Sequence, residues 1–256
     1  IMYLKLNKKI VNLFIFSSIF FGIFIRIYNI NYDDFWFDEI VSFWVSDPSI
    51  SIKESFDRNN MAEGSGFLYN FIFKLIYNLF QYDPNIGRYV SSIFSILSIF
   101  TLTYLSKLVS KNNSHLLTLF LVSFNVFLIL YSMESRVYSF LFFLINLNLI
   151  FLFKVIEYDK KNKNFKIYLY LFFFTQIISI LTHLFSIIVF FSIAVFCVLN
   201  YLLYKKRIKY LNQHLAIIFI FILFYLLYYF YFFPGFDSWI QQPSIKFLTN
   251  LYFSKF

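Results

Sequence analysis

The chain has 256 residues and a formal net charge of +9, and its composition is 60% hydrophobic but only 14% charged. Soluble domains carry about 25% charged residues, and the apolar residues here come in long blocks, so a soluble globular protein is set aside. The positive charge lies between those blocks rather than on one face, which argues against a nucleic-acid-binding protein.

Seven apolar blocks are long enough to cross a bilayer as helices, which takes roughly 20 residues for each span. The first block follows three lysines but precedes no small-residue cleavage site, so we interpret it as a span rather than a signal peptide. The sequence therefore predicts an all-α integral membrane protein with about seven transmembrane helices. The seven blocks cover residues 11–28, 89–106, 115–133, 137–153, 167–182, 184–204 and 212–233.

A further apolar stretch, residues 66–81, is short and carries polar residues at regular spacing. Asn70, Lys74, Asn78 and Gln81 are separated by four, four and three positions, which puts them on one face of a helix. We expect an amphipathic helix that lies at the membrane surface with its polar stripe toward water. This helix would belong to a long first exoplasmic loop, residues 29–88.

The distribution of basic residues supports this topology. If residues 66–81 do not cross, the N-terminus and three loops are cytoplasmic, and together they hold 14 of the 22 basic residues. If they did cross, the two most basic loops, 154–166 and 205–209, would face outside. We therefore predict a cytoplasmic N-terminus. The membrane is expected to be a bacterial or archaeal plasma membrane.

This topology brings an acidic pair to the exoplasmic side, directly after the first span. Asp38 and Glu39 follow Trp36 and Phe37 at the membrane surface. Partial desolvation there would raise the pKa of a carboxyl group toward the range that suits base catalysis. Metal binding and a plain solvated acidic loop are the alternatives.

Polar residues at the ends of other spans are further candidates. Arg88 opens the second span, where an arginine can hold a lipid phosphate or act as an interfacial anchor. Glu134 and Arg136 lie between two apolar blocks, where charges are costly unless they are paired or used. His183 lies at the outer turn between the fifth and sixth spans, either as a contact or as a helix-turn residue. Arg26, near the outer end of the first span, is interpreted as a snorkelling anchor.

Taken in order, these strings resemble the opening of the polytopic glycosyltransferases of the GT-C fold. They are most similar to the branch of the protein O-mannosyltransferases and the lipid A aminoarabinose transferases (glycosyltransferase family 39-like). One departure is clear: where that branch usually has His-Pro-Pro-Leu-Tyr, residues 63–69 keep only the Leu-Tyr. The matching strings are Arg26-Ile27-Tyr28, Trp36-Phe37-Asp38-Glu39, Gly87-Arg88-Tyr89-Val90-Ser91-Ser92, Glu134-Ser135-Arg136-Val137-Tyr138, Thr182-His183 and the stretch around Trp239.

The resemblance implies an inverting enzyme that transfers a hexose or pentose from a polyprenyl-phosphate donor. The acceptor would be an exoplasmic hydroxyl of a cell-envelope glycan, a lipid or a protein. Residues 1–256 would be the N-terminal transmembrane catalytic portion of a longer protein, with residues 234–256 starting a later exoplasmic loop.

The resemblance also implies roles for individual residues. Asp38 would be the base and Glu39 would orient the acceptor or the sugar, while Arg88 and Arg136 would bind the donor phosphate. No cofactor is required by this chemistry, although a divalent metal beside the two carboxylates stays open as an alternative. Supporting substrate contacts would come from Glu134, Tyr138 and His183.

Two other functions stay open on the sequence. A transferase for an entire lipid-linked oligosaccharide usually needs a metal and more acidic ligands. A transporter or lipid flippase should place charged residues inside the spans, near the midplane. The predicted span interiors hold mainly Ser, Thr, Asn and Gln, such as Asn146, Asn148 and Gln176. This difference favours chemistry at the outer surface.

Overall fold

The computed structural model describes residues 8–28, 30–31, 33–62, 66–110, 113–157, 163–204 and 211–232, and these residues form helices and no strand. The chain divides into two compact units, residues 1–214 and 215–256. The contacts and the site described below belong to the first unit, whereas most of α11 belongs to the second. The predicted loop at 234–256, with Trp239, lies outside the described residues.

Four helices in the described part are long and apolar enough to cross a membrane: α1 (Lys8–Ile27), α5 (Pro84–Val109), α8 (Val137–Glu157) and α9 (Lys163–Thr182). Shorter apolar stretches occur in α6 (Ser114–Phe124), α10 (Ser186–Tyr204) and α11 (Leu211–Phe232). The protein is therefore an α-helical membrane protein. Every predicted apolar block is helical, while the count of seven spans and the side of each loop stay predictions.

The third apolar block, residues 115–133, is not one continuous helix. It breaks at Asn125 into α6 and the short α7 (Val126–Leu130). The Asn125 side chain accepts a hydrogen bond of 3.0 Å from the backbone N–H of Leu128 and so caps α7. The break leaves backbone carbonyls at the end of α6 without partners in their own helix, and in an apolar environment these groups need donors.

Arg26 supplies those donors. Its guanidinium donates to the carbonyls of Val122 and Ser123, both at 2.9 Å, and to the hydroxyl of Ser95 at 2.8 Å. Gly22, one turn earlier on α1, permits this approach, because a Cβ there would lie 2.9 Å from the Cβ of Ser123. Arg26 is fully buried, so its interpretation as a snorkelling anchor was wrong. Arg26 is buried because its guanidinium donates to the backbone carbonyls that the break in the helix leaves without partners.

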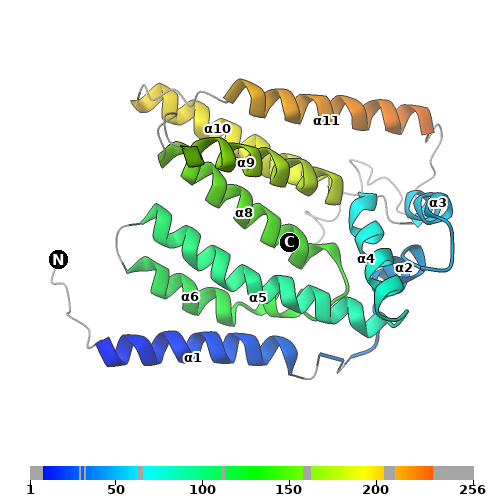
Figure 1. Cartoon of the computed structure of the whole chain (residues 1–256), viewed down its shortest axis with the longest axis horizontal. Helices are drawn as coiled ribbons and strands as arrows, with labels where there is room; N and C mark the ends of the chain where they lie inside the picture. The colour runs from blue at the N-terminus through cyan, green and yellow to red at the C-terminus, as the bar shows by residue number, and fades with distance from the viewer. Residues whose placement is uncertain are drawn as a thin grey trace, which may run out of the picture. The chain divides into compact units, whose positions relative to one another are not determined.

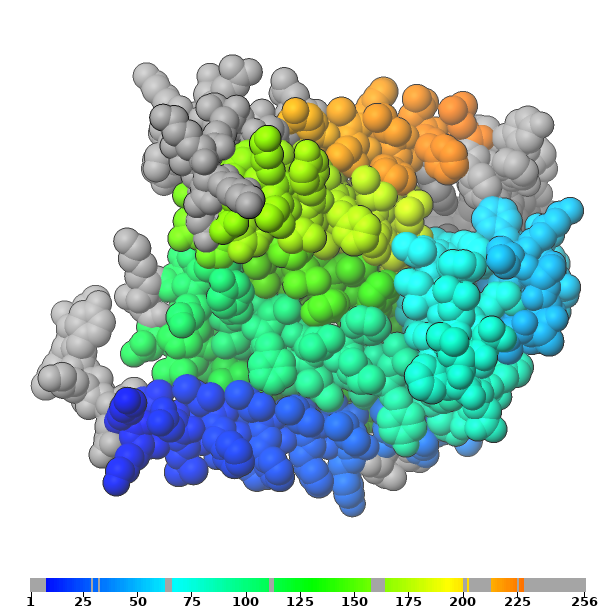
Figure 2. All heavy atoms as spheres, viewed as in Figure 1, coloured from blue at the N-terminus to red at the C-terminus, as the bar shows by residue number. Residues whose placement is uncertain are grey.

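Serines of α5 bind other backbone carbonyls near the same break. The Ser92 hydroxyl lies 2.7 Å from the carbonyl of Arg26 and 2.9 Å from that of Ser132. The Ser95 hydroxyl lies 3.2 Å from the carbonyl of Leu128. These contacts hold α1 and the α7 region against α5. The opposite side of α1 is uncovered, as the dark-blue helix in Figure 2 shows.

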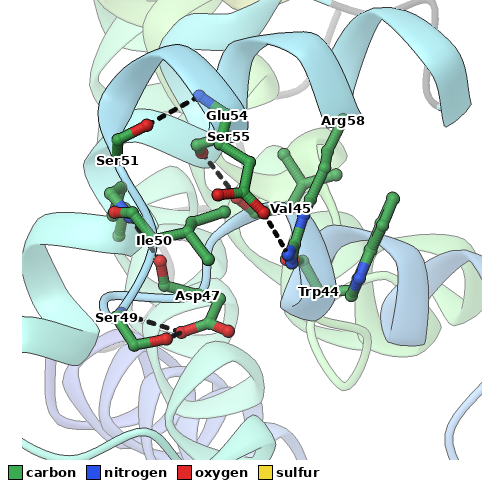
Figure 3. A network of polar contacts seen from close by, with 10 residues as sticks. Trp44, Val45, Asp47, Ser49, Ile50, Ser51, Glu54, Ser55 and Arg58 are labelled. Atoms are coloured by element: carbon green, nitrogen blue, oxygen red, sulfur yellow. Dashed lines mark hydrogen bonds and ion pairs between the residues drawn. The ribbon is translucent and has the colours of Figure 1, made fainter.

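Three shorter helices gather at one end of the long helices of the first unit: α2 (Phe37–Val45), α3 (Ile52–Ala62) and α4 (Phe67–Leu79) (Figure 1). They pack on one another, α2 packs on α5, and α4 packs on α9. The loop from α2 into α3 is held by the network in Figure 3, in which the Ser55 hydroxyl donates to the carbonyl of Val45 at 2.5 Å.

The helix predicted at 66–81 is present as α4, but half of its polar stripe does not face water. Asn70 is fully buried and donates to the Asn59 side chain at 2.7 Å. Lys74 is also buried, and its ammonium donates to the carbonyls of Asp47 and Ile50. Burial lowers the pKa of Lys74. The prediction was wrong for these two residues because α3 and its preceding loop cover them.

Three polar side chains, those of Asn148, Gln176 and His214, lie where α8, α9 and the first residues of α11 pack together. The side-chain nitrogen of Asn148 donates to the Phe172 carbonyl at 2.8 Å. The ring nitrogens of His214 lie 3.0 Å from Oε1 of Gln176 and 3.0 Å from the Phe190 carbonyl. All three polar side chains are buried. His214 was not among the predicted site residues, because a single histidine in an apolar block carries no motif.

Candidate functional site

The seven residues predicted from the sequence come together at the end of the unit where α2, α3 and α4 lie. Asp38 and Glu39 are in the first turn of α2, Arg88 is in the second turn of α5, and His183 directly follows α9. The remaining three belong to the link from α7 to α8 and the start of α8: Glu134, Arg136 and Tyr138. The contacts described below join them in one cluster.

Local sequence determines where α5 and α2 begin. Asp83 caps α5 by accepting from the N–H of Asn85 at 2.9 Å, and Pro84 occupies the first helical position. This places Arg88 close to the start of the helix. At α2, the Glu39 carboxylate reaches back to accept from the backbone N–H of Trp36 at 3.2 Å.

Arg88 and Glu39 form a buried ion pair at the centre of the cluster. The Nη2 of Arg88 lies 2.8 Å from Oε2 of Glu39, and its Nε lies 3.0 Å from Oε1. The remaining donors of Arg88 contact the carbonyls of Ile30, Asp33 and Asp34. Both side chains are almost fully buried, at 3% and 1% exposed. All five N–H donors of this guanidinium are therefore engaged within the protein.

The Glu39 carboxylate is equally occupied. Besides the two bonds from Arg88 and the one from Trp36, it accepts from the backbone N–H of Ser135 at 2.7 Å. An ionised carboxylate has about four lone-pair positions, and four hydrogen bonds fill them. Glu39 therefore does not fit a metal ligand in this arrangement. Within the described residues, no group of three or more His, Cys, Asp or Glu is placed to hold a metal ion.

Asp38 has the opposite environment. Its side chain is 58% exposed, and one carboxylate oxygen lies 3.4 Å from Nη2 of Arg136. Two further hydrogen bonds fix the Arg136 side chain, because its Nη1 donates to the Asp38 carbonyl at 3.0 Å and to the Ser42 hydroxyl at 3.1 Å. An exposed pair of this kind contributes only about 0–1 kcal/mol to stability. The carboxylate is open to a reactant, and a positioned cation stands beside it.

Glu134 is half-buried next to these charges. Burial raises the pKa of its carboxyl group, and the negative charge of Glu39 raises it further, while Arg136 acts in the opposite direction. The site thus holds one exposed carboxylate, one locked carboxylate and one carboxyl group biased toward its neutral form. Such divergence between neighbouring acids is common at functional sites.

Aromatic contacts extend the cluster to α9. The Arg136 guanidinium lies 5.8 Å from the ring centroid of Tyr138, and that ring lies 6.4 Å from the ring of His183. The Nδ1 of His183 accepts from the N–H of Phe185 at 3.2 Å. His183 therefore lies at the turn that follows α9, next to the Tyr138 ring.

Two glycines, Gly87 and Gly66, allow these segments to approach one another closely. A Cβ at Gly87 would lie 1.9 Å from the Ser135 hydroxyl, so only glycine lets α5 approach the link that carries Glu134 and Arg136. A Cβ at Gly66 would lie 2.0 Å from the carbonyl of Leu181, so glycine also lets α4 start against the end of α9. Gly66 belongs to the stretch that departs from the family pattern, and residues 63–65 of that stretch lie outside the described residues.

Comparison of the chain with family models, with curated proteins and with solved structures gave no match. The geometry of the cluster is therefore the evidence on which a function rests, together with the ordered strings of the sequence.

Proposed function

We propose that this chain carries the catalytic site of an inverting membrane glycosyltransferase. The enzyme would take a sugar from a polyprenyl-phosphate donor and transfer it to an acceptor hydroxyl on the exoplasmic side. The observation that carries the proposal is the pairing of an exposed Asp38 carboxylate with Arg136, 3.4 Å away, at one end of the candidate spans. A base beside a fixed cation suits a reaction in which a hydroxyl is deprotonated while a phosphate departs.

The chemistry assigns each group one task. The acceptor oxygen attacks the anomeric carbon from the side opposite the phosphate, and its proton passes to the Asp38 carboxylate. The bond between the anomeric carbon and the phosphate oxygen breaks, and the electron pair leaves with the phosphate. Arg136 stabilises the charge that develops there, and removing one preorganised donor of this kind typically lowers the rate about 10²–10³-fold. Inversion follows from the single displacement.

The proposal gives Arg88 and Glu39 positioning roles. Their mutual bonds fix the first turn of α2 and hence the direction in which Asp38 points. Binding of the donor phosphate by Arg88 would require it to release existing partners, so Arg136 is the better-placed phosphate ligand. Glu134 and Tyr138 flank Arg136 along the chain, and His183 lies beyond the Tyr138 ring, where contacts to the donor sugar or acceptor are expected.

The test is a transfer assay in membranes with a labelled polyprenyl-phosphate sugar. Asp38→Asn should abolish transfer with little loss of stability, because its pair with Arg136 is exposed. Asp57→Asn is the matched control, since Asp57 is an exposed acid on α3 that has no part in the proposed chemistry. Transfer that survives Asp38→Asn would remove this residue from the mechanism.

A transporter or lipid flippase is the second candidate, and one observation favours it. Polar groups lie buried inside the helix packing, including Arg26, Asn148, Gln176 and His214. Two of these are ionisable, which the sequence argument against a transporter did not anticipate. Each has partners that explain it structurally, so we rank this function below transfer. If the wild type transfers no sugar from any such donor, flux assays in vesicles become the deciding measurement.

A further inference from the structure

Helix α2 has two chemically different faces. Glu39, Ser42 and Val45 are at most 4% exposed and pack into the protein. The other side carries Phe37, Ile40 and Trp44, which follow one another at intervals of three and four residues. Their side chains are 69%, 52% and 41% exposed, respectively. Trp36, just before the helix, is 64% exposed. We call these four residues, Trp36, Phe37, Ile40 and Trp44, the α2 apolar face.

Such a face on a nine-residue helix is costly in water. Fully burying one large apolar side chain is worth about 1.5–3 kcal/mol, so four exposed ones require an apolar partner. The partner can be identified from the position of the helix and from the residues that border the face.

Arg88 ties α2 to the start of a candidate span. This residue lies near the start of α5, one of the candidate spans, and binds Glu39 of α2 directly. It also binds the carbonyls of Asp33 and Asp34, which lead into α2. The first turn of α2 is therefore held beside the start of α5, where a helix that crosses the membrane would leave the hydrocarbon layer.

Exposed aromatic residues also line α1, the first candidate span, and continue to its end. The rings of Phe16, Phe20, Phe24 and Tyr28 stack in sequence along the uncovered side of α1, with centroid separations of 6.1, 6.3 and 5.0 Å. The row ends at Tyr28, which is 65% exposed and directly follows the helix. The α2 apolar face comes next along the chain, so exposed aromatic side chains continue past the end of a span.

A cation borders the α2 apolar face. The Arg58 guanidinium lies 4.5 Å from the centre of the Trp44 ring and donates to the Trp44 carbonyl at 3.1 Å, as Figure 3 shows for these residues. Tryptophan and arginine together are typical of the headgroup region, where an apolar ring and a charge are both accommodated.

From these observations we propose that α2 lies on the membrane surface, with its apolar face in the boundary between headgroups and acyl chains. Asp38 sits between the apolar and buried faces, so this seating holds its carboxylate at headgroup depth. The inference depends on the membrane placement of the chain and not on sugar transfer. If the proposed transfer also holds, the α2 apolar face sets the depth at which a lipid phosphate meets Asp38.

The experiment uses tryptophan emission in vesicles that contain brominated phosphatidylcholine. The chain has three tryptophans, so two replacements by phenylalanine at a time leave Trp36 or Trp44 as the only reporter. We expect both reporters to lose emission, and to lose more with bromines near the headgroup than with bromines deep in the chains. Aqueous iodide should quench them only weakly.

Two matched reporters calibrate the depth scale in a background without native tryptophan. Phe20→Trp reports the uncovered side of α1, and Met61→Trp reports α3, at positions 52% and 70% exposed. The first should respond most to deep bromines and the second to iodide. Trp36 and Trp44 reporters that behave like the Met61 reporter would overturn the proposal. Reporters shielded from both quenchers would also overturn it, since another protein segment would then cover the face.

This assay needs no donor and no turnover, so its result is separate from the transfer assay. Loss of transfer in Asp38→Asn with no lipid quenching would reject the seating of α2 alone. Lipid quenching without any transfer by the wild type would reject the proposed function alone.

Discussion

The Arg88 guanidinium and the Glu39 carboxylate, 49 positions apart, form a buried ion pair that ties the start of α2 to the start of a candidate span. A buried pair of this kind contributes less to stability than its short distances suggest, because both charges lose their hydration. Its value lies in fixing geometry. Asp38, the neighbour of Glu39, projects from a turn that cannot rotate without breaking this pair.

Removing one partner of this pair should be severe. Glu39→Gln leaves the Arg88 charge buried and uncompensated, and we expect a loss of about 3–5 kcal/mol in the free energy of unfolding. Thermal unfolding in detergent, followed by circular dichroism, measures the change. Glu54→Gln is the control, because it breaks the exposed pair with Arg58 and should change stability by no more than about 1 kcal/mol. Equal effects of the two substitutions would contradict the structure.

The close approach at Gly87 gives a second prediction. Gly87→Ala places a Cβ 1.9 Å from the Ser135 hydroxyl oxygen, and we expect the overlap to destabilise the fold by about 1–3 kcal/mol. Ser135→Gly removes the two nearest clashing atoms, the hydroxyl oxygen and Cβ of Ser135, while the Tyr77 hydroxyl at 2.9 Å remains. The double variant should therefore be more stable than the sum of the single effects predicts. Strict additivity of the three unfolding free energies would show that the two residues do not touch.

Arg26 offers a graded series. Arg26→Leu leaves the carbonyls of Val122 and Ser123 without donors, and each unsatisfied buried group costs about 1–3 kcal/mol. Arg26→Lys keeps a charge and three donors but not the planar fork, so it should be intermediate. Unfolding temperatures in detergent should fall in the order wild type, lysine, leucine. A leucine variant as stable as the wild type would rule out the capping role.

Glu134 predicts a dependence on pH. Burial raises its pKa above the ordinary value of 4.5, so the folded state holds the proton more tightly than the unfolded state. The group therefore lowers stability as pH rises from 4.5 through the raised pKa, and the loss is complete above it. Glu134→Gln lacks this loss. Relative to the wild type, its unfolding temperature should be higher near neutral pH, with the difference shrinking below pH 4.5. A pH-independent difference would contradict the burial of the carboxyl group.

Much of the helical framework could be predicted from the sequence, because apolar blocks of span length have few alternatives in a membrane. Within the described residues, each of the seven blocks is mostly helical. The break at Asn125 was missed, since an asparagine inside an apolar run reads equally as a helix interior position or as a cap. Only the unpaired carbonyls around it, and Arg26 opposite them, show which role it takes.

The candidate site was predicted as a set of residues but not as an arrangement. Sequence order placed Asp38, Glu39 and Arg136 on one side of the predicted membrane, and the structure brings them into one cluster. Nothing in the sequence distinguished the exposed carboxylate from the buried one. That difference depends on Arg88 and on the Ser135 backbone, which are distant along the chain. The polar residues of α4 were wrongly predicted to face water for the same reason. Their partners, on α3 and its preceding loop, are not adjacent to them in the sequence.

The contact between Arg26 and the end of α6 has a consequence for how the protein is made. Arg26 emerges from the ribosome 97 residues before Ser123, whose carbonyl it binds. During that interval α1 carries a permanent positive charge without its internal partners, and an arginine within a span costs about 2.5–3.5 kcal/mol on insertion scales. The first helix is thus expected to settle fully into the bilayer only after the third apolar block has been synthesised. Membrane assembly of this chain is then an ordered event, in which a late segment completes the insertion of an early one.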